Sequence, residues 1–213
     1  MDAMILNHEP LLIVISSPSG AGKTSVCKMI LEKDSGIQIS ISATTRKARQ
    51  SEINGIDYNF ISRDDFKKKI KDNQFLEYAE VFDNFYGSLT KEVEKITDLK
   101  KDVLFDIDWQ GNQQLYQSRP SNLVSIFILP PSRSEIENRL KQRELESSDN
   151  DSIIDQRMLK FRDEISHWVE YDYVVVNSNL NTCAQEVLNI INAERKKRHR
   201  QIDLIDKVRE LSS

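Results

Sequence analysis

Residues 11–24, LLIVISSPSGAGKT, decide the fold. Residues 11–16 form a continuous apolar run, which is typical of a strand buried on both faces. A loop of small residues follows, and the next ten residues carry apolar side chains at Val26, Met29 and Ile30, a helical spacing. A strand, a loop and a helix in this order predict the opening of an α/β fold.

The loop Ser17-Pro18-Ser19-Gly20-Ala21-Gly22-Lys23-Thr24 is a P-loop in which Ser17 stands where the general pattern has glycine. Small residues let successive backbone N–H groups curl around a phosphate, and some of them need positive φ angles. The N-terminus of the following helix adds partial positive charge at the same place. We therefore expect Lys23 to reach the β- and γ-phosphates of a nucleotide and the Thr24 hydroxyl to bind Mg²⁺.

Asp106 and Asp108 lie at the end of a second apolar run, residues 103–107. A two-residue spacing along a strand places both carboxylates on one face. In a P-loop protein, an acid at the end of a neighbouring strand helps to hold Mg²⁺, directly or through water, so Asp106 is the expected second metal-binding residue. The alternative interpretation is a pair of solvated acids at a strand end.

The remaining pattern predicts an α/β fold, with a mostly parallel sheet and helices on both faces. Further buried strands are expected at 123–129 and 173–176, and helices at about 112–117, 133–146, 152–168 and 182–198. Residues 37–90 differ, because their short, aromatic-rich strands surround one helical piece at 64–72. They predict a small α+β lobe inserted after the first helix. Residues 143–152 are almost wholly polar and predict a loop.

The composition of the chain argues against a membrane protein, a secreted protein and a disulfide-rich protein. The chain has 213 residues, 38% of them hydrophobic, and a net charge of −4. Its longest apolar runs are far shorter than the ~20 residues that span a bilayer, and its first ten residues lack a secretory signal. Cys27 and Cys183 cannot form a disulfide framework. We expect a cytoplasmic protein that binds neither membrane nor nucleic acid, whether monomer or homo-oligomer. The basic residues at 195–200 are expected to form a solvated helix end, and the alternatives are an oligomer contact or a tail that touches RNA.

Several motifs occur together behind the P-loop: residues 42–49 (SATTRKAR) with Glu52, Gly55 and Tyr58, then Glu77, 86–88, 106–111, 139–143 and Arg157. As a set, in this order from about residue 11 to about residue 193, they resemble the guanylate kinases. The resemblance implies the reaction of ATP and GMP to ADP and GDP with Mg²⁺, in purine nucleotide metabolism. It also implies one domain over 1–213, divided into a core (about 10–36, 91–132 and 168–195), a GMP-binding lobe (about 37–90), a lid (about 133–167) and a basic tail (196–213).

The resemblance also implies residue roles. Arg46 and Arg49 match arginines that clamp the GMP phosphate, for which a planar fork is well suited. Glu77 matches the carboxylate that accepts the N1–H and N2 amino hydrogens of guanine, a donor pair that adenine lacks. The other matches to the GMP site are Tyr58 and Tyr86 at the phosphate, Ser42 and Ser88 near O6, and Asp108 near the bound nucleotide. The matches to the ATP site are Ser17, Pro18, Ser19, Gly20, Ala21, Gly22, Lys23, Thr24, Ser25 and, near the adenine, Asn177. The residues expected to act in catalysis are Lys23, Arg46 and the lid arginines Arg139, Arg143 and Arg157.

Two other functions remain open at this point. One is a P-loop kinase for a different phosphate acceptor, against which Glu77 and Ser42 argue. The other is a non-catalytic guanylate-kinase-like binding module, which would typically have a degraded P-loop. The intact Gly22-Lys23-Thr24 argues against that module.

Overall fold

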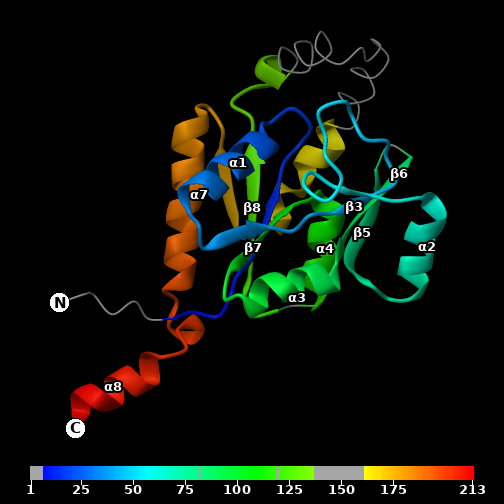
Figure 1. Ribbon diagram of the computed structural model, residues 1–213. Helices are drawn as coiled ribbons and strands as arrows, with labels where there is room; N and C mark the ends of the chain where they lie inside the picture. Colours follow the sequence, from blue (N-terminus) through cyan, green and yellow to red (C-terminus); the bar gives the residue numbers. More distant parts are fainter. Residues whose placement is uncertain (1–6, 82, 119, 137–160) are drawn as a thin grey trace.

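The computed structural model describes residues 7–81, 83–118, 120–136 and 161–213. Its centre is a five-stranded sheet with the order β2-β7-β1-β8-β9, in which each strand runs parallel to its neighbours (Figure 1). The strands are β1 (Leu12–Ser16), β2 (Ile37–Ile39), β7 (Asp102–Asp106), β8 (Leu123–Leu129) and β9 (Tyr173–Val176). The predicted strands at 123–129 and 173–176 are therefore confirmed.

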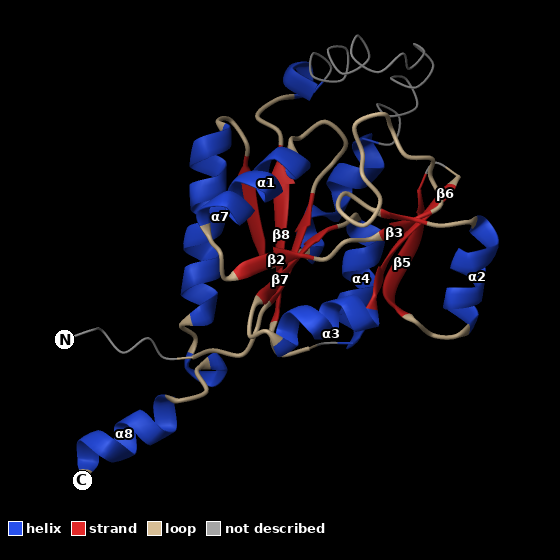
Figure 2. Cartoon of the chain, viewed as in Figure 1, coloured by secondary structure: helices blue, strands red, loops and turns tan. Residues whose placement is uncertain are grey.

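Helices cover both faces of this sheet (Figure 2), as the apolar runs predict. Helices α1 (Lys23–Lys33) and α7 (Leu180–Arg195) pack on one face, and α3 (Thr90–Asp98) and α4 (Trp109–Ser118) on the other. Side chains alternate along β1, so Ile13 and Ile15 enter the first core while Val14 enters the second. Each fully buried aliphatic side chain contributes roughly 1.5–3 kcal/mol.

The first core also holds both thiols. Cys27 of α1 and Cys183 of α7 are each 1% exposed, and neither forms a disulfide. Burial raises the pKa of the Cys27 thiol well above its usual range and that of Cys183 to about 11.

The predicted inserted lobe is present as a second, four-stranded sheet with the order β4-β3-β6-β5. Its elements are β3 (Ala43–Thr44), β4 (Asn59–Phe60), α2 (Arg63–Lys71), β5 (Phe75–Val81) and β6 (Asn84–Leu89). The fully buried Phe66 fixes α2 to this sheet by stacking on Phe75 and Phe85, with ring centroids 4.3 and 5.3 Å away.

One boundary of the predicted lobe needs correction. β2 lies within 37–90, but it pairs with β7 at the edge of the core sheet, with Ile37 opposite Asp102. The lobe's own sheet therefore begins at Ala43. A strand of three residues has the same local pattern in either sheet, and only its distant partner β7 decides to which sheet it belongs.

The region after β8 is described in part. Residues 133–136 and 161–166 are helical and are followed by the 3₁₀ helix η1 (His167–Glu170). The rest of the helices predicted at 133–146 and 152–168 lies outside the described residues. At the C-terminus, η2 (Arg198–Arg200) leads to α8 (Leu204–Ser212), which extends away from the body of the molecule (Figure 1). Over the described residues, every helix is too short or too polar to cross a membrane.

The expectation of a solvated basic helix end is wrong for two of its residues. Arg195 donates through Nε to Oδ2 of the fully buried Asp102 at 2.7 Å, and through Nη1 to Asp34 at 2.7 Å. Arg200 is only 4% exposed and forms an ion pair with the buried Glu194. A cluster of cations in sequence gives no sign of buried acids that approach from other elements.

Replacing Arg195 by Leu should lower the free energy of unfolding by about 3 kcal/mol, because the buried Asp102 carboxylate would lose its cationic partner. Urea unfolding measures the change. The matched control is Arg209→Leu, whose ion pair with Asp206 is exposed on α8 and should change stability by less than about 0.5 kcal/mol. Equal effects of the two substitutions would contradict the assignment.

Candidate active site

The P-loop has the backbone conformation that its small residues predict. Gly20 and Gly22 have φ angles of 85° and 91°, a region that side chains with a Cβ rarely occupy. The buried Asn177 follows β9, and its Nδ2 donates to the carbonyl of Ala21 at 2.8 Å. Asn177 thus supports the loop from a distant strand. Its proposed place near an adenine remains a prediction.

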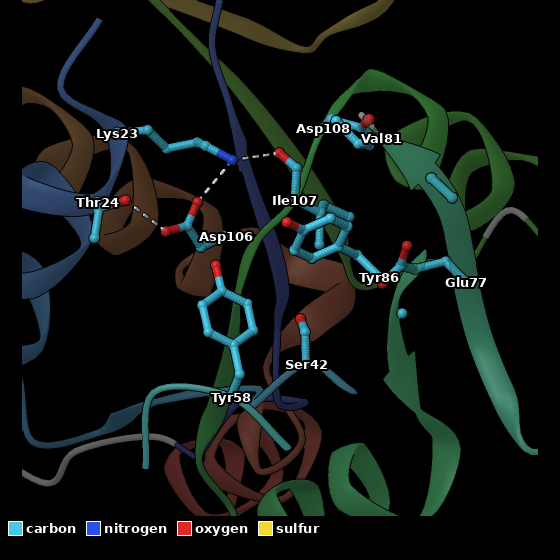
Figure 3. Close-up of a pocket in the computed structure, with 12 residues that line it drawn as sticks. Lys23, Thr24, Ser42, Tyr58, Glu77, Val81, Tyr86, Asp106, Ile107 and Asp108 are labelled. Carbon is cyan, nitrogen blue, oxygen red and sulfur yellow. Dashed lines mark hydrogen bonds and ion pairs between the residues drawn. The ribbon is translucent and has the colours of Figure 1, made fainter. Parts of the chain in front are cut away.

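Three side chains at the carboxyl ends of β1 and β7 form a hydrogen-bonded group (Figure 3). Nζ of Lys23 lies 2.7 Å from Oδ1 of Asp106 and donates to the carbonyl of Ile107 at 2.9 Å. The Thr24 hydroxyl donates to Oδ2 of Asp106 at 3.1 Å. Burial disfavours the charge on Lys23, but the Asp106 carboxylate outweighs it and raises the pKa of the ammonium. The two residues expected at a metal, Thr24 and Asp106, are therefore side by side.

A pocket of about 250 Å³ opens next to this group and reaches into the inserted lobe (Figure 3). The sequence-predicted residues that line it are Lys23, Thr24, Ser42, Tyr58, Glu77, Tyr86, Asp106 and Asp108. They come from the P-loop, the lobe and the end of β7. The fold therefore joins the two predicted substrate regions in a single pocket.

Glu77 on β5 is the most unusual side chain of the pocket. It is 3% exposed, and its Oε1 has no hydrogen-bond partner among the described residues. Burial and the nearby Asp108 raise its pKa to about 7, although the adjacent Ser88 on β6 opposes the rise. Gly111 of α4 comes so close that a Cβ there would lie 2.5 Å from Oε2 of Glu77. A buried carboxylate oxygen without a partner is costly, so Oε1 of Glu77 is ready to accept a hydrogen bond from a ligand.

Asp108 both lines the pocket and starts a helix. Its Oδ1 accepts hydrogen bonds from the backbone N–H groups of Gln110 at 3.1 Å and Gly111 at 3.2 Å. These bonds cap α4 and fix the glycine that faces Glu77. Asp108 therefore also positions the helix that walls the predicted guanine site.

Arg46 and Arg49 do not line the pocket, and Arg46 lies at its edge. The Arg46 guanidinium is 5.3 Å from the ring centroid of the pocket residue Tyr58 and is paired with Glu52. Glu52 is one of the residues that carry the family resemblance, but the resemblance assigns it no role. Its spacing could have indicated a role, because Glu52 lies six residues after Arg46 and three after Arg49, within one short loop.

A second residue without a sequence-based role contacts the P-loop itself. Oε2 of Glu164 accepts a hydrogen bond from the backbone N–H of Ser19 at 2.8 Å. The segment that carries it is docked on the core, since the His167 ring stacks on Trp109 at a centroid distance of 3.7 Å. No local pattern distinguishes Glu164 from other helical acids. The predicted lid arginines Arg139, Arg143 and Arg157 lie outside the described residues.

A P-loop at the carboxyl end of the central strand of a parallel sheet, facing a polar pocket on an inserted lobe, defines the class of P-loop phosphotransfer proteins. Comparison with known proteins refines this. The sequence model of the family described as Guanylate kinase matches residues 9–194. A guanylate kinase of Sphingopyxis alaskensis is 49% identical over 210 residues, covering 99% of this chain and 94% of that protein. One from Paramagnetospirillum magneticum is 49% identical over 206 residues, covering 97% of this chain and 95% of that protein.

A solved structure agrees with these relatives. The crystal structure of guanylate kinase from Anaplasma phagocytophilum superposes with a TM-score of 0.77 at 35% identity, covering 94% of each chain. This chain belongs to the guanylate kinase family.

Replacing Glu77 by Gln should stabilise the ligand-free protein at pH 8. The pKa of Glu77 lies near 7 in the folded chain and near 4.5 when unfolded, so the folded state binds the proton more tightly and loses stability as pH rises through this window. The variant's stability relative to the parent should therefore grow by about 2–3 kcal/mol between pH 5 and pH 8. Urea unfolding at both pH values measures this difference.

Glu80→Gln is the matched control, because Glu80 lies on the same strand with a half-exposed side chain. Its effect should stay nearly constant between the two pH values. A pH-independent effect of Glu77→Gln would mean that Glu77 titrates normally.

Proposed function

We propose that the chain transfers the γ-phosphoryl group of ATP to GMP and releases ADP and GDP. The observation that carries the proposal is the buried Glu77, whose Oε1 has no hydrogen-bond partner among the described residues, in the same pocket as the P-loop residue Lys23. The pocket therefore provides a carboxylate that can accept hydrogen bonds from a base and a cation that can bind a phosphate.

Recognition of GMP rests on two groups of residues. An ionised Glu77 can accept both the N1–H and an N2 amino hydrogen of guanine, whereas adenine would leave the buried carboxylate unpaired, which is a costly mismatch. In this proposal, Ser42 and Asp108, which line the pocket, and Ser88, which pairs with Glu77 across β5 and β6, complete the guanine site. Arg46, Arg49, Tyr58 and Tyr86 supply donors for the phosphate.

The chemistry needs no nucleophile from the protein. An oxygen of the largely dianionic GMP phosphate attacks the γ-phosphorus of ATP in line with the leaving ADP oxygen, so catalysis is mainly positioning and charge stabilisation. Residues 17–25 hold the donor phosphates through loop N–H groups, and Lys23 lies where charge develops. The lid arginines Arg139, Arg143 and Arg157 are proposed to close over the phosphates and exclude water.

Thr24 and Asp106 suit Mg²⁺, because their hydroxyl and carboxylate oxygens already lie together at the strand ends. Within the described residues, no group of three or more His, Cys, Asp or Glu side chains could hold a metal ion. Mg²⁺ is commonly bound by one or two carboxylates with substrate phosphates and water, which fits such a sparse set. When bound, the ion neutralises charge on the transferring phosphates. The proposal places this reaction in the cytoplasm, in GMP recycling.

The test is a coupled assay of ADP release from Mg·ATP with GMP, AMP, CMP, UMP and dTMP offered in parallel. We expect turnover with GMP alone. Glu77→Gln should lower kcat/KM for GMP by at least a hundredfold, because the neutral amide cannot accept both guanine donors. Glu80→Gln on the same strand should keep the parent's activity. Turnover with another acceptor, or an unchanged Glu77→Gln variant, would contradict the assignment.

A further inference from the structure

We propose that Glu52 is a positioning residue for the phosphate half of the GMP site: it fixes Arg46 and the backbone at Arg49 and does not itself touch the substrate. The inference rests on the proposed function, and it assigns a role to a residue at the pocket's edge. Its basis is the set of contacts that Glu52 makes with the two arginines.

The Glu52 carboxylate and the Arg46 guanidinium form a two-pronged pair. Nη1 of Arg46 donates to Oε2 at 2.9 Å and Nη2 donates to Oε1 at 2.8 Å. Both side chains are largely buried, with exposed fractions of 19% for Arg46 and 12% for Glu52. Parallel bonds of this kind fix the plane of the guanidinium as well as its position.

The same carboxylate also closes the loop that carries the second arginine. Oε2 of Glu52 accepts the backbone N–H of Arg49 at 2.8 Å, and the N–H of Glu52 donates to the carbonyl of Arg49 at 3.1 Å. Glu52 therefore ties the side chain of Arg46 to the backbone at Arg49. A single residue sets the relative positions of both phosphate-clamping arginines.

The hydrogen-bond donors of Arg46 show that Glu52 and a phosphate can bind it together. A guanidinium carries five N–H donors. Nη1 uses its two on Glu52 and on the carbonyl of Lys47, and Nη2 uses one on Glu52. Tyr86, which lines the pocket, is a further hydrogen-bond partner of the Arg46 side chain. Glu52 and Lys47 leave the Nε–H and the second Nη2–H, which form the side edge of the fork. That edge is a two-donor surface of the kind that binds phosphate oxygens.

The residues around the pair place Arg46 beside the pocket and keep Glu52 ionised. The Arg46 guanidinium lies over Tyr58, and both Tyr58 and Tyr86 line the pocket. Hydrogen bonding to Arg46 lowers the pKa of Glu52. If Glu52 instead competed with the phosphate, it would have to leave Arg46 and the Arg49 N–H at the same time. As a fixed support, it lets the phosphate bind a side chain whose rotational freedom is already lost.

Calorimetric binding of GMP and guanosine to the full chain separates positioning from a general structural role. Guanosine keeps the base and lacks the phosphate. In Glu52→Gln the amide cannot form the charged fork, so GMP should bind at least tenfold more weakly. Guanosine affinity and the KM for ATP should change less than twofold.

A double-mutant cycle tests whether Glu52 acts through Arg46. Arg46→Lys removes the fork and should weaken GMP binding selectively, as Glu52→Gln does. Adding Glu52→Gln to Arg46→Lys should then lower the affinity for GMP by less than a further threefold. Glu80→Gln is the control, because it breaks the exposed Arg63–Glu80 ion pair of the same lobe and should leave both affinities unchanged.

Four results would overturn the inference. Unchanged or tighter GMP binding in Glu52→Gln would make Glu52 neutral or a competitor, and equal losses for GMP and guanosine would give it a merely structural role. Fully additive losses in the cycle would remove the link to Arg46. If the parent chain bound guanosine as tightly as GMP, the proposed acceptor site itself would fail, and the inference with it.

Discussion

The parallel pairing of β1 with β7 is the constraint on which the site depends. It aligns Ile15 with Asp106, so the P-loop leaves the sheet beside the acid that ends β7. Lys23 and Thr24 then lie at hydrogen-bond distance from Asp106. Two residues further on, Asp108 caps α4, which begins at the next residue. Since α4 carries Gly111 against Glu77, the same pairing also places the wall of the lobe pocket.

Two acids of the lobe show how the fold can use one type of side chain in opposite ways. Glu52 is surrounded by donors, and its pKa is lowered. Glu77 is buried with an unpaired oxygen, and its pKa is raised to about 7. The first stabilises the loop in the absence of ligand. The second costs stability until a ligand supplies the missing donors, a common arrangement where specificity is needed.

The local parts of the fold and site could be predicted from the sequence. Short patterns predict the P-loop, the buried strands and the α+β lobe. The P-loop pattern selects Lys23, the strand end selects Asp106, and the family resemblance selects Glu77; the structure shows that all three line one pocket. What could not be predicted depends on partners far apart in the chain. β2 belongs to the core only because β7 pairs with it, and Arg195 is held against the core only because the buried Asp102 accepts its hydrogen bond. The roles of Glu52 and Glu164 likewise appear only as contacts.

The buried thiols have a practical consequence for chemistry on this protein. A thiolate is the reactive form of cysteine, and both native thiols are enclosed and hard to ionise. Alkylating reagents and mild oxidants should therefore spare Cys27, although it lies one turn of α1 beyond Lys23. A cysteine introduced on the exposed surface of the lobe would then carry a fluorescent probe selectively, with both native cysteines left in place.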